Sequence, residues 1–560
     1  MRITTPQSIG RMTFLHYDDP RFLKGLSQHG IPEPYGYRVL NTGLSGQPFA
    51  ACFSNIDRAN QSNRLFHVDR ILGGMPFIDI DGIEEIAQGC HDNSSFLGFQ
   101  AHEWENGPLM DLLRIGKRFT QTGTPFDAEH FEPYRNRSQD PYFSSGNYDV
   151  YKNLPHTIRS HEELRDFYRG FLSYFSSRAN GQLMAVNGSY QLHHLATKIG
   201  VRSLVAEVGN QVPLSYIQIA AARGAGRQAH KPFGVYYEPW GGKPSSCTSS
   251  MPWSPWFGED IPLGKADNGL GLPMGSGLGS SRSLQKRLLY YSWLSGAAFV
   301  SEEWGAENYF SDWENFTLTE YGHISIEFQK TISPYSKPQP LVPLALVMPP
   351  GVVGIDNTYL TREDDSPIFK FLEADTFHHK LRRFAHQFLA AKPPVQGHDD
   401  YNLTSSPYIS SFDILGHDAP PSLLDKYQCV VYFEQQQMKN CPLPPARKLY
   451  FDGSDEQIAL CREVVDSAWP LRVEGEVGCA MAVVDNQYMV GIFNNLGVTK
   501  EHVNEVHRPE ATRSVTLHGD FREREVVCGS EFICNAQANN ITLSLPAGEI
   551  FLMITGGHVQ

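Results

Sequence analysis

The sequence predicts an α/β protein in which a (β/α)8 TIM barrel is followed by a second, smaller α/β domain and a C-terminal β-sandwich. From about residue 45 to 335, short apolar runs alternate with helical stretches, as in βα units around a parallel sheet. A proline-rich segment at 333–343 then precedes another α/β stretch. After residue 470 the pattern changes to short alternating runs separated by turns, which is typical of a β-sandwich. The predicted domains are 1–335, 340–470 and 471–560.

The barrel prediction depends on seven strands and a candidate for an eighth. In chain order they are Tyr37–Leu40 (the candidate), Phe49–Ser54, Pro76–Ile80, Phe96–Glu103, Leu183–Asn187, Ser203–Glu207, Phe233–Glu238 and Ala297–Glu303. The helices expected between and after them include Glu162–Ser176, Leu214–His230, Leu284–Ser295 and Thr319–Ile332. Seven or eight such units in one continuous block favour a closed barrel over an open sheet.

The two later regions are predicted from fewer elements. An apolar strand at 344–348, a helix at 378–391 and a strand at 429–433 indicate βα units in the middle region. The C-terminal region contains the runs AMAVVD, YMVGIFNN, SVTLHG and ITLSLPAGEIFLMI, which alternate with turn-rich segments.

Composition disfavours several classes of function. Asp and Glu number 61 against 47 Lys and Arg, a formal charge of −14, whereas a protein that follows a nucleic-acid backbone normally has a basic surplus. There is no run of 18 apolar residues, so no membrane-spanning helix is expected. The N-terminal residues contain no apolar stretch resembling a secretory signal, and a cytoplasmic protein is expected.

Cysteine and glycine patterns predict neither a metal nor a nucleotide. The nine cysteines are odd in number and lack C-x-x-C spacing, which argues against a zinc site or a dense set of disulfides. No H-E-x-x-H, G-x-G-x-x-G or Walker sequence occurs. We therefore expect no cofactor.

Glutamates recur where the predicted barrel strands end. Four of five consecutive strand ends carry one: Glu103, Glu207, Glu238, and the pair Glu302 and Glu303. The remaining strand of these five, Leu183–Asn187, ends in asparagine. Three tryptophans, Trp104, Trp240 and Trp304, lie within two residues of these glutamates. The C-terminal ends of barrel strands form the active-site face of TIM barrels, so these side chains are expected to gather there.

Such a grouping of carboxylates suits glycoside cleavage. An isolated glutamate at a strand end is usually a solvated loop residue, but several around one cavity repel one another. Glycosidases need one protonated carboxyl group to protonate the leaving oxygen and one ionised carboxylate as nucleophile or base. Neighbouring carboxylates push the two pKa values apart, and aromatic side chains bind the faces of sugar rings.

Two segments, 207–242 and 281–305, resemble multi-domain glycoside hydrolases of the large retaining (β/α)8 clan that are built like β-galactosidases. The resemblance implies a barrel, a flavodoxin- or amidotransferase-like domain and a C-terminal β-domain. It further implies an oligosaccharide or glycoside substrate with a terminal β-linked sugar, no cofactor, and a homo-oligomer, either a dimer or a trimer.

By this resemblance the catalytic glutamates lie on barrel strands four and seven. Counting back from Ala297–Glu303 as strand eight makes Glu103 the acid/base and Glu238 the nucleophile. The clan usually has Asn before the acid/base, whereas His102 stands here, and related hydrolases often carry Ser at the position of Glu238. Glu207 and Glu303 are therefore alternative partners for Glu103. The residues expected to bind substrate are His102, Trp104, Asn187, Asn210, Trp240, Glu302 and Trp304.

Other interpretations remain open from the sequence. The barrel could belong to an inactive carbohydrate-binding or scaffold protein, or to a metal-dependent carbohydrate lyase or isomerase. Arg223 and Arg227, four residues apart on a predicted barrel helix, are expected to be solvated or ion-paired on its outer side.

Overall fold

The structure of the chain is a computed structural model. It describes residues 11–31, 36–39, 50–62, 64–72, 83–101, 122–125, 129–130, 159–209, 214–238, 266–267, 273–274, 280–302, 309–312, 314–351, 376–390, 402–501 and 504–556. Within these ranges no helix is both long and apolar enough to cross a bilayer.

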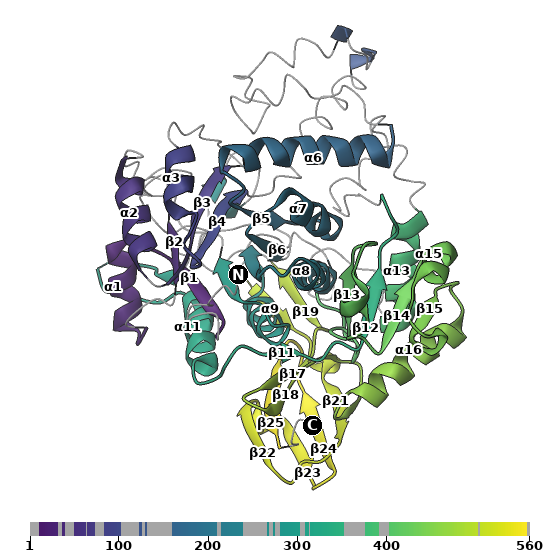
Figure 1. Cartoon of the computed structure of the whole chain (residues 1–560). Helices are drawn as coiled ribbons and strands as arrows, with labels where there is room; N and C mark the ends of the chain where they lie inside the picture. The colour runs from purple at the N-terminus through teal and green to yellow at the C-terminus, as the bar shows by residue number, and fades with distance from the viewer. Residues whose placement is uncertain are drawn as a thin grey trace.

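Eight parallel strands close into a barrel, and each strand pairs with its neighbours in chain order (Figure 1). The strands are β1 (Thr13–Tyr17), β2 (Gly36–Val39), β3 (Leu65–Leu72), β4 (Phe96–Ala101), β5 (Leu183–Asn187), β6 (Ser203–Gly209), β7 (Phe233–Glu238) and β10 (Phe299–Glu302). The predicted closed parallel barrel is thus confirmed. So is the strand count behind the assignment of glutamates, because β4 is the fourth strand and β7 the seventh.

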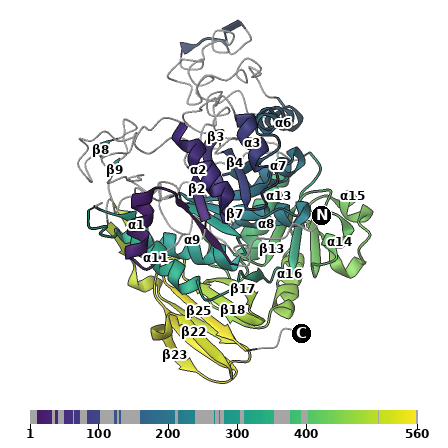
Figure 2. The same ribbon diagram turned by 60° about the vertical axis from the view of Figure 1, so that its left-hand side comes forward.

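Helices follow the barrel strands. They are α1 (Pro20–Gln28), α2 (Ala50–Gln61), α3 (Ile83–Cys90), α6 (His161–Arg178), α7 (His193–Ile199), α8 (Ser215–Ala229), α9 (Arg282–Leu294) and α11 (Glu320–Ile332). Figures 1 and 2 show them around the outside of the barrel. Several have local start signals: Ser160, Ser281 and Thr319 each accept a hydrogen bond from a backbone N–H of the first turn.

The N-terminal part of the barrel differs from the prediction. The run Phe49–Ser54 was expected to be a strand, but residues from Ala50 onward belong to helix α2. A short apolar run without periodicity fits a buried strand and a buried helix equally well. The true strands β1 and β3 were not predicted, so the barrel begins at Thr13 instead of near residue 45. The predicted strand Pro76–Ile80 lies outside the described residues.

The barrel interior is an apolar cluster with contributions from nearly every strand. Its members are Leu15, Leu65, Leu97, Met184, Val186, Val205, Tyr236, Ala298 and Phe299. The residues that alternate with them, such as Phe14, Ala185 and Val235, belong to the larger core shared with the surrounding helices. Since side chains alternate between the two faces of a strand, these clusters show which residues point inward.

A second sheet of four parallel strands follows the barrel. Its order is β13 (Phe412–Leu415), β12 (Leu344–Val347), β14 (Cys429–Tyr432), β15 (Lys448–Tyr450). The helices α13 (Thr376–Leu389), α14 (Pro421–Leu424), α15 (Gln435–Asn440) and α16 (Asp455–Ala468) accompany it. The parallel pairing fits the predicted βα units, while the amidotransferase-like assignment stays a prediction.

The C-terminal region forms two larger antiparallel sheets (Figure 1). One has the order β11 (Gln339–Pro340), β17 (Gly478–Val484), β18 (Gln487–Phe493), β25 (Ile550–Thr555), β22 (Arg524–Cys528), and the other β16 (Arg472–Glu474), β21 (Arg513–His518), β24 (Asn540–Leu545), β23 (Ile533–Ala536). Strand β11 lies in the proline-rich segment after the barrel, so this segment pairs with the C-terminal sheet. The proposed domain boundaries near residues 340 and 470 stay predictions.

Three short helices and four short strands complete the described elements of the barrel and C-terminal parts. They are η3 (Tyr190–Leu192), η7 (Pro509–Ala511), η8 (Ser530–Phe532), β8 (Ala266–Asp267), β9 (Pro273–Met274), β19 (Val498–Glu501) and β20 (Asn504–His507). A further 3-10 turn, η6 (Pro445–Arg447), precedes β15.

Helix α8 joins the barrel to the second sheet by a close contact. A Cβ on Gly224 would lie 2.0 Å from the carbonyl oxygen of Ile414 in β13, so only glycine lets the helix approach this near. Beside it, Arg223 and Arg227 both pair with the fully buried Asp413, each at 2.6 Å. Arg223 is itself 2% exposed. These arginines are ion-paired, as expected, but across a buried interface.

Candidate active site

Two of the predicted glutamates point into the barrel from neighbouring strands. On β6, Glu207 lies two residues beyond Val205, and on β7, Glu238 lies two residues beyond Tyr236. Both reference residues belong to the interior cluster, so the pleat directs both glutamates inward. Glu207 is 1% and Glu238 4% exposed.

The strand register places these glutamates at different heights in the barrel. Glu207 is aligned with Tyr236 on β7, which in turn is aligned with Ser301 on β10. Glu238 is aligned with Gly209, two residues nearer the C-terminal end. From ordinary strand spacing and rise, the Cα atoms of the two glutamates are roughly 8 Å apart. Long side chains can bring two such carboxyl groups considerably closer or keep them separated.

Gly209 is required for this arrangement. Its φ is +154°, and a Cβ there would lie 2.1 Å from the backbone oxygen of Glu238 and 2.9 Å from its Cβ. Any larger residue would therefore displace the end of β7 that carries Glu238.

An arginine that the sequence reading missed lies at the centre of the polar interior. Arg38 of β2 is 2% exposed and donates hydrogen bonds to the Asp69 carboxylate (2.9 Å) and the Tyr236 hydroxyl (2.9 Å). It also donates to the backbone oxygen of Glu302 at 2.5 Å. Its guanidinium carbon lies 5.3 Å from the centroid of the Tyr236 ring. Arg38 thereby connects strands β2, β3, β7 and β10 on the inner side.

His67 and Gln100 add uncharged polar groups to the same interior. His67 lies between Leu65 and Asp69 on the inward face of β3, and it is fully buried. Burial lowers the pKa of His67 to about 3, so its imidazole is neutral at ordinary pH. Gln100 of β4 is aligned with the inward Met184 and is fully buried. The polar interior thus combines acidic, basic and neutral side chains.

Glu302, predicted to bind substrate, points the other way. It alternates with the inward-facing Ser301, and its carboxylate accepts hydrogen bonds from Tyr309 (2.7 Å) and from Ser325 of α11 (2.6 Å). Burial raises the pKa of Glu302 above its usual range, and these hydroxyl groups offset only part of that shift. The side chain therefore lies between strand and helix, a position that does not favour direct contact with a sugar.

Asn187, also predicted to bind substrate, likewise lies on the outer side of its strand. It follows the inward-facing Val186, and its Nδ2 lies 3.1 Å from Nδ1 of the fully buried His193 on α7. Burial, and to a lesser extent the charge of neighbouring His194, lowers the pKa of His193 to about 3. The geometry thus favours a structural contact between β5 and α7.

The remaining predicted site residues lie outside the described residues. These are the catalytic candidates Glu103 and Glu303 and the substrate-binding candidates His102, Trp104, Asn210, Trp240 and Trp304. Their predicted roles stay predictions.

The residues missed by the sequence reading had a recognisable signal. In LFHVDR (65–70), polar residues alternate with apolar ones, so His67 and Asp69 share the face of Leu65. Arg38 lies in the short run GYRV, where a charged residue between apolar neighbours is equally consistent with an exposed face. Only barrel closure shows that these faces point inward.

In the part of the chain that the structure describes, no group of three or more His, Cys, Asp or Glu side chains is placed to hold a metal ion.

No family model matches the chain, and no curated protein is significantly similar to it in sequence. Among solved structures it is similar to α-L-fucosidase isoenzyme 2 from Paenibacillus thiaminolyticus and to a β-galactosidase from Rahnella sp. R3. Each aligns with a TM-score of 0.44 at 10% identity, over 98% of this chain and 99% of the other.

Proposed function

We propose that the protein is a glycoside hydrolase that removes a terminal β-linked sugar by means of two glutamates at the C-terminal end of its barrel. The observation that carries the proposal is the inward direction of Glu207 and Glu238 on the adjacent strands β6 and β7. Two carboxyl groups that face the same glycosidic bond are the minimum requirement of this chemistry.

The chemistry follows from the different states that such carboxyl groups adopt. One is protonated and gives its proton to the glycosidic oxygen, while the other is ionised and either attacks the anomeric carbon or activates a water. The transition state resembles an oxocarbenium ion, whose positive charge a carboxylate-rich cavity stabilises. The Arg38 network would hold β2, β3 and β7 in place, and its positive charge favours ionisation of a nearby carboxyl group.

Within the proposal, Glu103 keeps the acid/base role that the family resemblance implies. Its partner is Glu238 on strand seven, or Glu207 on strand six. Glu303 is the remaining candidate. The terminal β-linked sugar and the stereochemical outcome both belong to this proposal. The outcome depends on the distance between the two carboxyl groups: a distance of roughly 5–5.5 Å gives retention, and one of roughly 6.5–9.5 Å gives inversion.

The test begins with a panel of nitrophenyl α- and β-glycosides and the variants Glu103→Gln, Glu207→Gln and Glu238→Gln. Loss of a catalytic carboxyl group should lower kcat/KM about 100-fold or more at unchanged fold, as judged by circular dichroism. Glu320→Gln, on the exposed start of α11, is the matched control and should retain activity.

A second measurement assigns the roles. The same three glutamates are replaced by alanine, and azide is added to each variant. Azide should restore turnover where the missing carboxylate was the nucleophile, because the small anion can attack the anomeric carbon from the position of the carboxylate. Its glycosyl azide product then has the configuration opposite to that of the normal product.

The proposal fails if turnover remains within about tenfold of the wild type in all three variants. Sugar binding in the absence of any hydrolysis would instead support a carbohydrate-binding or scaffold protein. Turnover that is abolished by EDTA and restored by a divalent cation would support a metal-dependent lyase or isomerase.

A further inference from the structure

A large cavity lies at the opposite end of the barrel from the glutamates. Its volume is about 1800 Å³. One wall consists of residues that precede or begin the barrel strands, including Gln182 before β5, Arg202 before β6 and Lys231 before β7. The other wall comes from the proline-rich segment 337–343 and from the loop 420–428 of the second sheet region.

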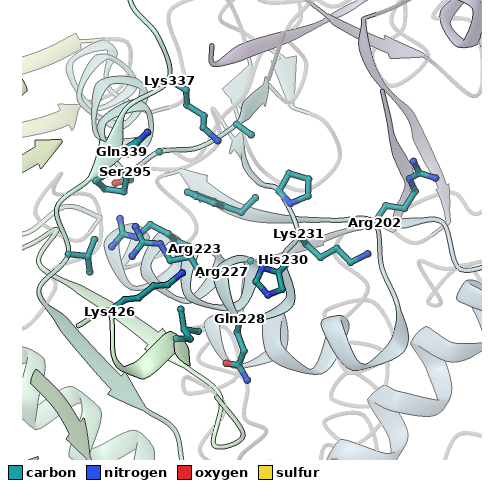
Figure 3. Close-up of a pocket in the computed structure, with 18 of the residues that line it drawn as sticks. Arg202, Arg223, Arg227, Gln228, His230, Lys231, Ser295, Lys337, Gln339 and Lys426 are labelled. Atoms are coloured by element: carbon teal, nitrogen blue, oxygen red, sulfur yellow. The ribbon is translucent and has the colours of Figure 1, made fainter. Parts of the chain in front are cut away.

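The lining of this cavity is strongly cationic (Figure 3). The Lys and Arg side chains that line it are Arg202, Arg223, Arg227, Lys231, Lys337 and Lys426. Asp92 is the one carboxylate among the described lining residues. Since the whole chain has a formal charge of −14, a concentration of positive charge at one place runs against its composition.

Only part of this charge is neutralised within the protein. Arg223 and Arg227 share the single carboxylate of Asp413, so one positive charge remains in this group. The Tyr427 hydroxyl also donates to Asp413, at 2.6 Å, and uses part of its remaining acceptor capacity. Nη1 of Arg223 is buried and has no hydrogen-bond acceptor among the described residues. A guanidinium that is 2% exposed and has an unused donor is suited to an anionic ligand.

The other cations have no ion pair in the described part of the chain. Arg202 donates to the backbone oxygens of His91 (2.9 Å) and Asn93 (2.5 Å) and to the side chain of Gln182 (3.0 Å), all of them neutral acceptors. No carboxylate within the described ranges lies at ion-pair distance from Lys231, Lys337 or Lys426.

The electrostatic environment of two lysines agrees with this. Burial lowers the pKa of Lys337, and burial together with repulsion from Arg202 lowers the pKa of Lys231. An anion bound near Lys231 and Lys337 would raise the pKa of both lysines and so oppose these shifts.

Helix polarity explains only some of these residues. Arg227 and Lys231 lie at or just beyond the C-terminal end of α8, where the helix dipole favours cations. Lys337 lies in the proline-rich segment and Lys426 in the loop after α14, away from that helix end in sequence. Their presence on the same cavity therefore requires another reason.

We propose that this cavity binds a small molecule that carries two or more phosphate groups. Phosphate matches the lining better than carboxylate, because it carries more charge per group and accepts the paired N–H donors of arginine. The six cations exceed the two nearby carboxylates, Asp413 and Asp92, by four charges, which suits more than a single phosphate, and the volume leaves room for an attached nucleoside or sugar. Gln228, Ser295 and Gln339, which also line the cavity in Figure 3, supply neutral hydrogen-bonding groups.

The experiment is calorimetric titration of the full-length protein with pyrophosphate, with inorganic phosphate and with sodium chloride at matched ionic strength. Pyrophosphate should bind about tenfold or more tightly than phosphate, and its heat of binding should exceed that of the salt titration. ADP and glucose 1,6-bisphosphate form two further arms. The tighter of the two indicates whether the phosphates belong to a nucleotide or to a sugar.

Variants locate the site. Lys426→Gln and the double variant Lys231→Gln/Lys337→Gln should weaken pyrophosphate binding by about tenfold or more. Lys439→Gln, an exposed lysine of α15 that does not line the cavity, removes the same charge and should leave affinity within about twofold. Lys426 is exposed, so its substitution tests the site without disturbing buried structure.

The inference is overturned if pyrophosphate binds no better than chloride, or if Lys439→Gln weakens binding as much as Lys426→Gln does. Since the titration uses no glycoside, its result is independent of whether the barrel hydrolyses sugars.

Discussion

The two ends of the barrel combine the same types of residue with opposite surpluses of charge. Near the C-terminal end, the buried Arg38 pairs with Asp69, and the buried Glu207 and Glu238 also point inward. Near the N-terminal end, two arginines share the single Asp413, and further lysines and Arg202 line the adjoining cavity. Among the described residues, inward carboxyl groups outnumber cations at the first end, and lining cations outnumber carboxylates at the second.

This difference shows that a formal net charge conceals where the charge lies. The protein is acidic overall, yet the cavity at the N-terminal end of its barrel is cationic, and Glu207 and Glu238 point inward near the other end. Carboxyl groups gathered in one place favour a cationic transition state, and cations gathered in one place favour an anionic ligand. The proposed oxocarbenium-like transition state at one end and the proposed phosphates at the other have the charges that are needed.

The largest effect on the charge difference between the two ends of the barrel is expected from a substitution of Asp413. Asp413→Asn leaves the buried Arg223 and the partly exposed Arg227 without their counter-ion, and unpairing a buried charge typically costs about 3–5 kcal/mol of unfolding free energy. These arginines lower the pKa of Asp413 although burial opposes them. Its stabilisation is therefore present at neutral pH and is lost only as the pH falls through the depressed value. Denaturant unfolding at pH 7 measures the change.

Asp425→Asn is the matched control for Asp413→Asn. Asp425 pairs with Arg447 at 2.6 Å, but its side chain is 66% exposed, so its removal should cost less than about 1 kcal/mol. Equal effects of the two substitutions would contradict the buried role of Asp413.

A smaller effect is expected from Gly224→Ala, which tests the contact that holds the basic end together. The added methyl group would meet the backbone oxygen of Ile414 at 2.0 Å, so α8 and β13 would have to separate. Overpacking of this kind costs about 1–3 kcal/mol. Gly170→Ala on α6 meets nothing within 4 Å and should instead stabilise the protein by about 0.5–1 kcal/mol. If both changes stabilise, the close contact is not required.

Several parts of the fold were predictable because each βα unit carries its own local signal. Strands β5 and β7 begin and end at the predicted residues, and α9 differs from the prediction by two residues at its start. These segments combine an apolar strand with a helix of clear boundaries. The first barrel units lack such clear signals: the run at 49–54 is as apolar as a strand, but its residues from Ala50 onward form the start of α2.

The candidate site was predictable only in part, because closure decides which strand face is inside. Strand-end position identified Glu207 and Glu238, but it equally identified Glu302 and Asn187, whose side chains face the helices. Arg38 contacts Asp69, 31 positions away, and Tyr236, 198 positions away. Arg223 and Asp413 lie 190 positions apart in the sequence. No local pattern in the sequence encodes such pairs.

A further expected effect concerns acid, because His193 of α7 is buried in its neutral form beside β5. Burial lowers the pKa of His193 to about 3, below its value of 6.5 in an unfolded chain. Between pH 3 and 6.5 the unfolded chain binds a proton at His193 more readily than the folded protein does. The free energy of unfolding therefore falls as the pH drops below about 6.5. His193→Gln should therefore reduce the pH dependence of the unfolding free energy by about 1.4 kcal/mol per pH unit between pH 6 and 4.5. Denaturant midpoints across this range measure it, with His323→Gln on the exposed face of α11 as the control. An unchanged slope in His193→Gln would mean that the pKa of His193 is the same in the folded and the unfolded protein, and hence that burial does not disfavour its protonated form.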